Sequence, residues 1–370
     1  MLVAVALALT AIPSAASAGV VEGTTLYTLP PATHAYSMTA GPEGAIWFTG
    51  SQADEPFGGS GNAVVGRVAV DGQVRFFDLP SNRVTGEIVA GPDGNLWFTE
   101  TYRNERGYTV ARLGHMTPSG QFGEYLIGEH VGGTGSMTAG PDGNLWFISA
   151  FWKKGRKKLA IARFDVASEE LRRFHLPPRS GPTDIVAGPD GNLWFSERGG
   201  EVSRIGRITP EGQVTHFSLP DRKMVAGAMT VGPDGNIWFA EFLRRYAGNP
   251  RSSVGRIAPS GQIREFRLPE GSSAATLVSG PAGRLWYTAR SSHGNSAIGS
   301  LSPNGTASEL ECLPAPSECE IDADVLAVGH DGALWFSASK YWSHMGGGGT
   351  GIMESMAEAA EAGQIGRFAP

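Results

Sequence analysis

The feature that most constrains the fold is a string close to Ala-Gly-Pro-Asp-Gly-Asn-Leu-Trp-Phe, which occurs seven times along the chain. Successive copies are 44 to 50 residues apart. The first glycine of each copy stands at Gly41, Gly91, Gly140, Gly188, Gly232, Gly280 and Gly329. A repeat of this length is typical of architectures in which each unit buries its apolar surface against its neighbours.

Each repeat predicts four short strands. The Pro-Asp-Gly segment supplies the positive φ that a tight turn needs between the first two strands. The apolar residues of Asn-Leu-Trp-Phe are consecutive, which is expected of a strand covered on both faces. A third strand resembles Ile-Gly-Arg-Ile, as at Ile205–Ile208, and a fourth ends in Leu-Pro, where proline interrupts the ladder. Four-stranded sheets repeated radially form a β-propeller.

The two ends of the chain indicate how the ring closes. The last repeat stops at Phe368 with a third strand but no fourth, whereas Thr24–Pro30 reads as a fourth strand ahead of the first complete repeat. An open solenoid would need distinct caps at both ends. We therefore predict an all-β, seven-bladed β-propeller of four-stranded blades, in which the N-terminal strand joins the last blade and residues 24–370 form a single domain.

Residues 1–18 have the pattern of a signal peptide, with an apolar stretch followed by a small-residue cleavage site at Ala16-Ser17-Ala18. A short membrane anchor or a disordered tail is the alternative. We expect a secreted or periplasmic protein. In such a compartment Cys312 and Cys319, the only two cysteines, are expected to form a disulfide, because a structural zinc site would need four ligands.

The net charge of −6 argues against binding to nucleic acid, because phosphate backbones attract basic surfaces. One local exception is the basic cluster Lys153–Lys158, which predicts either a solvated hairpin tip or a contact with an anionic cell-surface polymer.

Strand alternation sorts the loops into two faces. The short turns between strands one and two and between strands three and four of each blade emerge on one face, here called the turn face. The loops between strands two and three, and between strand four and strand one of the next blade, differ from repeat to repeat. They emerge on the other face, here called the variable face. Binding residues usually lie on such loops above a rigid scaffold. We expect a monomer that takes a small molecule or an extracellular partner there, around the mouth of the central channel.

Residues at the start of strand one and just after strand two are predicted to surround that mouth. The ligand-binding candidates are Tyr36, Glu100, Asp184, Glu197, Glu241, Asp324, Tyr341 and Trp342. Carboxylates that converge on one axis, including Glu87, could hold a divalent cation. Alternatively, these acids pair with Arg198, Arg290 or solvent.

Two segments carry a resemblance to a known family. Gly-Pro-Asp-Gly-Asn-Leu-Trp-Phe-Thr-Glu at Gly91–Glu100 and Ile-Gly-Arg-Ile-Thr-Pro-Glu-Gly at Ile205–Gly212 resemble the virginiamycin B lyase family. The resemblance implies a seven-bladed propeller and a Mg²⁺-dependent elimination that opens the ring of streptogramin B antibiotics. It also implies active residues on the last two blades: a histidine opening strand one of the sixth, and Glu-x-His before strand one of the seventh.

In this chain those slots hold Ala275 and Asp322-Ala323-Asp324. Asp322 and Asp324 remain candidates for Mg²⁺ or another divalent cation, but the histidine base is missing. His293 and His344, in loops of the same blades, are candidates for a relocated base or are merely solvated. We therefore expect a binding or interaction scaffold, with a metal-dependent lyase of altered catalytic residues as the alternative.

Overall fold

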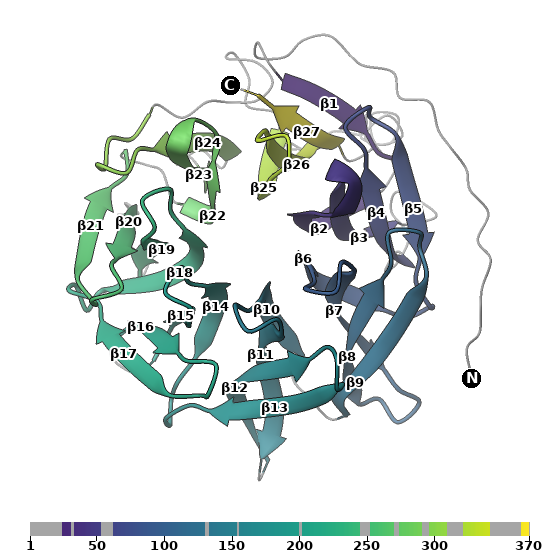
Figure 1. The fold of residues 1–370 in the computed structure, drawn as a ribbon, viewed down its shortest axis with the longest axis horizontal. Helices are drawn as coiled ribbons and strands as arrows, with labels where there is room; N and C mark the ends of the chain where they lie inside the picture. The colour runs from purple at the N-terminus through teal and green to yellow at the C-terminus, as the bar shows by residue number, and fades with distance from the viewer. Residues whose placement is uncertain are drawn as a thin grey trace, which may run out of the picture.

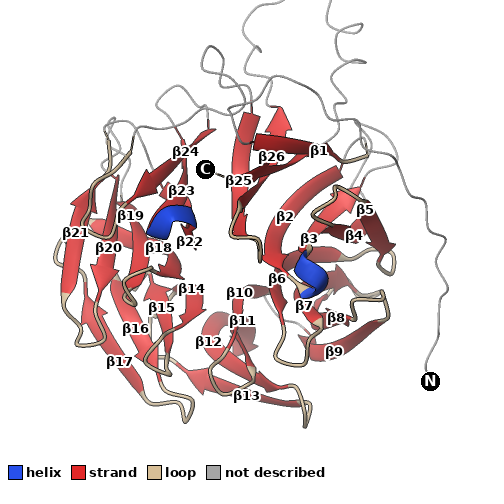
Figure 2. Ribbon diagram, turned by 45° about the horizontal axis from the view of Figure 1, so that its top comes forward, coloured by secondary structure: helices blue, strands red, loops and turns tan. Residues whose placement is uncertain are grey.

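In a computed structural model, the chain is described over residues 24–30, 33–52, 62–129, 133–153, 155–199, 202–244, 252–269, 274–290, 296–308, 321–340 and 364–369. Seven antiparallel sheets stand around a central channel, as Figure 1 shows. The predicted all-β, seven-bladed propeller is confirmed. Apart from two short 3₁₀ turns, η1 (Pro42–Gly44) and η2 (Pro281–Gly283), the described elements are strands (Figure 2).

In the first six blades the strands are arranged outward from the channel in chain order, and in the seventh the N-terminal strand is outermost. The first blade comprises β2 (Thr33–Ala40), β3 (Ile46–Gln52), β4 (Asn62–Val68) and β5 (Val74–Asp78); the second β6 (Val84–Ala90), β7 (Leu96–Arg103), β8 (Thr109–Met116) and β9 (Phe122–Glu129); the third β10 (Thr134–Ala139), β11 (Leu145–Lys153), β12 (Arg156–Asp165) and β13 (Glu170–His175); the fourth β14 (Pro182–Ala187), β15 (Leu193–Glu197), β16 (Arg204–Ile208) and β17 (Val214–Ser218). The fifth comprises β18 (Met224–Val231), β19 (Ile237–Leu243), β20 (Ser252–Ile257) and β21 (Ile263–Arg267); the sixth β22 (Ala274–Gly280), β23 (Arg284–Arg290) and β24 (Ser296–Leu301); the seventh β25 (Ile321–Val328), β26 (Leu334–Lys340), β27 (Gln364–Phe368) and β1 (Thr24–Thr28).

The seventh blade closes the ring as predicted. Strand β1 pairs antiparallel with β27, with Thr24 opposite Phe368 and Thr28 opposite Gln364. The N-terminal strand is thus the fourth strand of the last blade. In the sixth blade the described residues form three strands, and the expected fourth strand ending at Pro314 lies outside them. The predicted signal peptide and the predicted Cys312–Cys319 disulfide also lie outside the described residues.

The hydrophobic core lies between the blades. Trp194 and Ile205 of the fourth blade pack with Ile237 and Phe239 of the fifth, and every neighbouring pair of blades repeats this arrangement. An aromatic side chain buries about 150–250 Å², so each such tryptophan contributes roughly 4–6 kcal/mol of gross hydrophobic stabilisation. This two-sided burial explains why the strand-two residues are consecutively apolar.

The glycine of the third strand is required by close packing. Phe195 on β15 lies opposite Gly206 on β16, and a Cβ at Gly206 would come within 2.1 Å of the ring of Phe195. The same glycine–aromatic contact occurs in other blades, for example between Gly255 and Phe239. The recurrent Ile-Gly-Arg string is therefore part of the scaffold.

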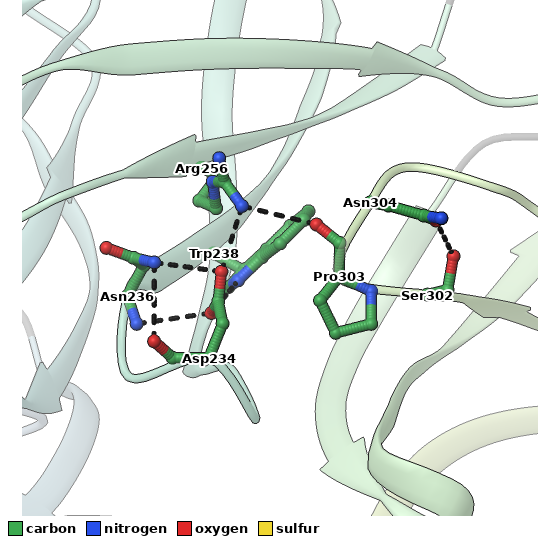
Figure 3. A network of polar contacts seen from close by, with 7 residues as sticks. All are labelled: Asp234, Asn236, Trp238, Arg256, Ser302, Pro303 and Asn304. Carbon is green, nitrogen blue, oxygen red and sulfur yellow. Dashed lines mark hydrogen bonds and ion pairs between the residues drawn. The ribbon is translucent and has the colours of Figure 1, made fainter.

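The repeated acid of the turn also has a structural role. Asp234 Oδ1 accepts hydrogen bonds from Trp238 Nε1 (2.8 Å) and from the backbone N–H of Asn236 (3.2 Å), as Figure 3 shows. Arg256 donates to Asp234 Oδ2 (3.0 Å) and to the carbonyl of Pro303 (3.2 Å) in the next blade. The most repeated residues thus stabilise the turns and the contacts between blades on the turn face. A binding site is therefore expected on the variable face.

Candidate functional site at the channel mouth

Every inner strand carries a β-bulge at the same depth in the channel. The register of strands one and two shifts between Ala35 and Ser37 in the first blade, and at the matching position in the other six. The residues within these bulges include Tyr36, Gly86, Gly135, Thr183, Gly227, Ala275 and Asp324. These are the positions predicted to open strand one, and the structure places them inside it. Bulges of this kind redirect side chains and recur beside functional sites.

A second ring of residues follows the bulges and links neighbouring blades. Ser37 of the first blade donates a hydrogen bond to Glu87 Oε1 of the second (3.1 Å). Ser136 of the third blade donates to Asp184 Oδ1 of the fourth, and Asp184 Oδ2 accepts the backbone N–H of Met229 in the fifth (2.6 Å). Two half-buried acids thus link the inner strands of the first and second blades, and those of the third, fourth and fifth.

Both acids have perturbed ionisation. Burial and, to a smaller extent, the negative charge of Asp184 raise the pKa of Glu87 to about 7, and the hydrogen bond from Ser37 opposes the rise. Burial also raises the pKa of Asp184, against the hydrogen bonds from Ser136, Met229 and Ile185. Perturbed carboxyl groups facing a channel are candidates for proton transfer or ligand contact.

Three of the predicted ligand-binding acids occupy one register position on strand two. Glu100, Glu197 and Glu241 have exposed fractions of 1%, 0% and 0%, so in this conformation their carboxylates are not presented to solvent. They point between blades beneath the variable face. Their partners differ from blade to blade.

Glu197 belongs to a charged cluster on the fourth blade. Arg204 on β16 forms an ion pair with Glu197 Oε1 (2.8 Å), and His216 Nε2 on β17 lies 3.0 Å from Oε2. Burial lowers the pKa of His216, although the Glu197 carboxylate acts in the opposite direction. The predicted alternative partner, Arg198, instead lies over the ring of Phe242 (4.7 Å to the ring centroid).

Glu100 lies in a larger network on the second blade. Arg83 Nη2 pairs with Glu124 Oε2 (2.8 Å), and Arg83 Nε lies 3.7 Å from Glu100 Oε2. Arg112 also pairs with Glu124 (3.0 Å). Burial, with the neighbouring Glu124 carboxyl, raises the pKa of Glu100 to about 8, and Arg83 and Arg112 oppose this rise.

Glu241 has the fewest polar partners of the three. Ser253 Oγ donates a hydrogen bond to Glu241 Oε2 (2.9 Å), while Oε1 has no hydrogen-bond partner among the described residues. Burial and, to a smaller extent, the charge of Glu265 raise the pKa of Glu241 to about 7, against the hydrogen bond from Ser253. A carboxyl group in this setting is about half protonated near neutral pH.

Of the remaining predicted residues, Tyr36 is 49% exposed in its bulge, and its hydroxyl group bonds to that of Ser51. Asp322 and Asp324 lie on β25, with Asp322 opposite Ser339 and Asp324 in the bulge. Their side chains are outside the description. His293, His344, Tyr341 and Trp342 lie outside the described residues.

Within the part of the chain that the structure describes, no group of three or more His, Cys, Asp or Glu side chains could hold a metal ion. Nor does that part contain a helix long and apolar enough to span a membrane.

Sequence reasoning missed two kinds of residue. Ser37 and Ser136 gave no signal, because a serine in a strand is unremarkable until its partner in the next blade is known. His216 could have been noticed, because it stands on the fourth strand opposite the repeated glycine, Gly206. The corresponding residues in the neighbouring blades are Arg173 and Glu265, so this position varies in charge.

The comparisons with known proteins agree with this architecture. The sequence profile of the Virginiamycin B lyase family matches residues 16–150, 108–248 and 149–343. No curated protein matches the chain.

Several solved structures are similar. Virginiamycin B lyase from Staphylococcus aureus is 25% identical, with 94% of this chain and 99% of that chain covered and a TM-score of 0.67. A catalytically inactive histidine-to-alanine variant of that enzyme with quinupristin is 24% identical, with coverages of 94% and 100% and a TM-score of 0.67. A streptogramin B lyase is 22% identical, with coverages of 94% and 98% and a TM-score of 0.65. The chain belongs to the virginiamycin B lyase family.

Proposed function

We propose that the protein is a ligand-binding β-propeller that uses the variable face around its channel mouth, without the histidine-dependent chemistry of its family. The partner is a small molecule or an extracellular, cell-surface component. The signal-like residues 1–18 support export to the periplasm or the exterior.

The observation that carries this proposal is which residues occupy the β-bulges of the inner strands in the sixth and seventh blades. Where the family resemblance expects a histidine on the sixth blade, Ala275 lies exposed in the bulge of β22. On the seventh blade Asp324 takes the second histidine's place in the bulge of β25. An elimination needs a base that is available near neutral pH, and neither residue is a histidine.

The family resemblance also implies a metal ion at the seventh blade. Carboxylates suit Mg²⁺, and Asp322 and Asp324 would be its ligands by the family resemblance.

One observation favours a second candidate function, a lyase with a relocated base. His34 is exposed near the start of β2, two residues before the bulge, and β2 contacts β25, the strand that carries Asp322 and Asp324. A histidine is thus carried by the inner strand next to the one whose slot lacks it. In this alternative His34 would abstract the substrate proton.

Quinupristin is a suitable probe of the binding proposal. Isothermal titration calorimetry with the intact chain is expected to show quinupristin binding. Ala275→Trp should abolish it, because the indole would occupy space at the channel mouth beside the β22 bulge. Ser119→Trp, on an exposed three-to-four turn of the opposite face, is the matched control and should bind as the parent does. Equal affinity in both variants would contradict binding at the channel mouth.

A further inference from the structure

The β11–β12 hairpin is the most strongly basic feature of the described chain, and the ligand-binding proposal does not use it. It extends beyond the outer strand β13 in Figure 1. Its strands stay paired to the tip, with Trp152 opposite Lys157 and Lys153 opposite Arg156. The hairpin is therefore an ordered support for the side chains that it carries.

The described side chains near the hairpin tip are exposed, and all but Trp152 are positively charged. Trp152 has an exposed fraction of 53%, and Lys153, Arg156, Lys157 and Lys158 are all exposed. Cations directly opposite one another in a sheet repel and destabilise it. No acidic side chain among the described residues forms an ion pair with any of the four. An anionic ligand would relieve this repulsion.

The cations continue beyond the hairpin along the variable face. Further exposed basic residues lie in its loops on the second to fifth blades: Arg103, Arg106, Arg179, Arg198, Arg222 and Lys223. On the turn face the arginines of strand three instead pair with the repeated acids, as in the Arg256–Asp234 and Arg367–Asp331 pairs. The variable face thus carries an arc of exposed basic residues, in whose loops Glu105, Glu129 and Asp221 are also exposed, and the hairpin is the part of this arc without an exposed acid among its described residues.

We propose that this arc, centred on the β11–β12 hairpin, binds an anionic polysaccharide that bears carboxylate or sulfate groups. The inference rests on the proposed function in one respect, that the variable face is the binding face. An extended polyanion fits an arc that spans four blades, and the exposed indole of Trp152 supplies a flat apolar surface for a sugar ring. Complementary charge of this kind also raises the association rate.

A lipid surface fits the same residues less well. Phe151 and Trp152 point to opposite sides of the hairpin, since neighbouring residues of a strand alternate, and Phe151 lies against His175 (5.5 Å between ring centroids). Trp152 is therefore the one large apolar side chain free near the tip, whose other described side chains are charged. A single aromatic anchor gives little insertion into a bilayer.

The test compares binding of the full chain to four probes: heparin, polygalacturonate, neutral dextran, and vesicles of phosphatidylcholine with phosphatidylglycerol. Binding to heparin or polygalacturonate is expected, with loss of affinity between 50 and 200 mM NaCl. Lys157→Gln/Lys158→Gln should weaken it by about tenfold or more. Arg75→Gln/Arg264→Gln, which removes the same charge from exposed positions near the turn-face ends of β5 and β21, should leave it unchanged. Trp152→Ala should weaken polysaccharide binding without altering its salt dependence.

Three results would overturn the proposal: equal weakening in the two double variants, binding to vesicles but to neither polymer, or binding to neither polymer. Melting temperatures establish that the variants fold. Quinupristin binding, measured in the same samples, separates this proposal from the previous one. If Lys157→Gln/Lys158→Gln binds quinupristin as the parent does, the channel mouth works independently of the hairpin.

Discussion

Replacement of Glu241 by glutamine should change how the stability of the protein depends on pH. The carboxyl group is buried, accepts one hydrogen bond from Ser253 and has its pKa raised from 4.5 to about 7. A raised native pKa gives stability that is fully present below the unfolded-state pKa and is lost as pH rises through the native one. Stability should therefore fall between about pH 4.5 and pH 7, because over this range the unfolded state ionises the carboxyl group while the native state keeps it protonated.

The size of the loss in unfolding free energy follows from the pKa shift of Glu241. About 2.5 pKa units at 1.36 kcal/mol each correspond to roughly 3 kcal/mol lost above pH 7. Because glutamine cannot ionise, Glu241→Gln should be more stable than the parent by about that amount at pH 8, and nearly equal to it at pH 4.5. With an unfolding entropy of about 2.1 cal/mol/K per residue, the gain at pH 8 corresponds to a rise in melting temperature of about 4 °C.

Differential scanning calorimetry at pH 4.5, 6 and 8 measures this difference. Glu105→Gln is the control, because Glu105 is exposed and its replacement should have little effect at any of these pH values. A Glu241→Gln variant that is less stable than the parent at pH 8 would refute the reasoning, since it would mean that the carboxylate is ionised and favourably paired.

Three further substitutions test the scaffold and the channel. Gly206→Ala should destabilise the protein by about 1–3 kcal/mol in urea unfolding, because the new Cβ would meet the ring of Phe195; an unchanged midpoint would contradict the packing argument. Asp234→Asn should cost about 1–2 kcal/mol through the weakened Arg256 pair, and the loss should shrink in high salt if that charge matters. Glu87→Gln should flatten the pH dependence between about pH 4.5 and 7 in calorimetry, because burial raises the native pKa of this acid to about 7; an unaltered profile would show that Glu87 does not titrate there.

The fold was predictable because its determinants are local and repeated. The turn chemistry, the consecutive apolar residues of strand two and the glycine of strand three recur in step, and the strand Thr24–Thr28 completes a blade that the C-terminus leaves unfinished. Even the closing pair of strands could be inferred, since each repeat specifies the same four-stranded unit.

The site was less predictable because it depends on contacts between blades. Counting three residues from each tryptophan places Glu100 and Glu241 just after strand two. Strands β7 and β19 continue to Arg103 and Leu243, so both acids lie inside the sheet and are buried. No local pattern indicates that a bulge interrupts each inner strand, or that Ser136 meets Asp184 in the next blade.

The most direct test of the central claim, ligand binding without the family's chemistry, is mass spectrometry of quinupristin incubated with the purified chain and Mg²⁺. The account predicts that quinupristin keeps its intact ring. Accumulation of the linear product, abolished by a chelator, would contradict the account. Loss of that product in His34→Asn would then identify the relocated base.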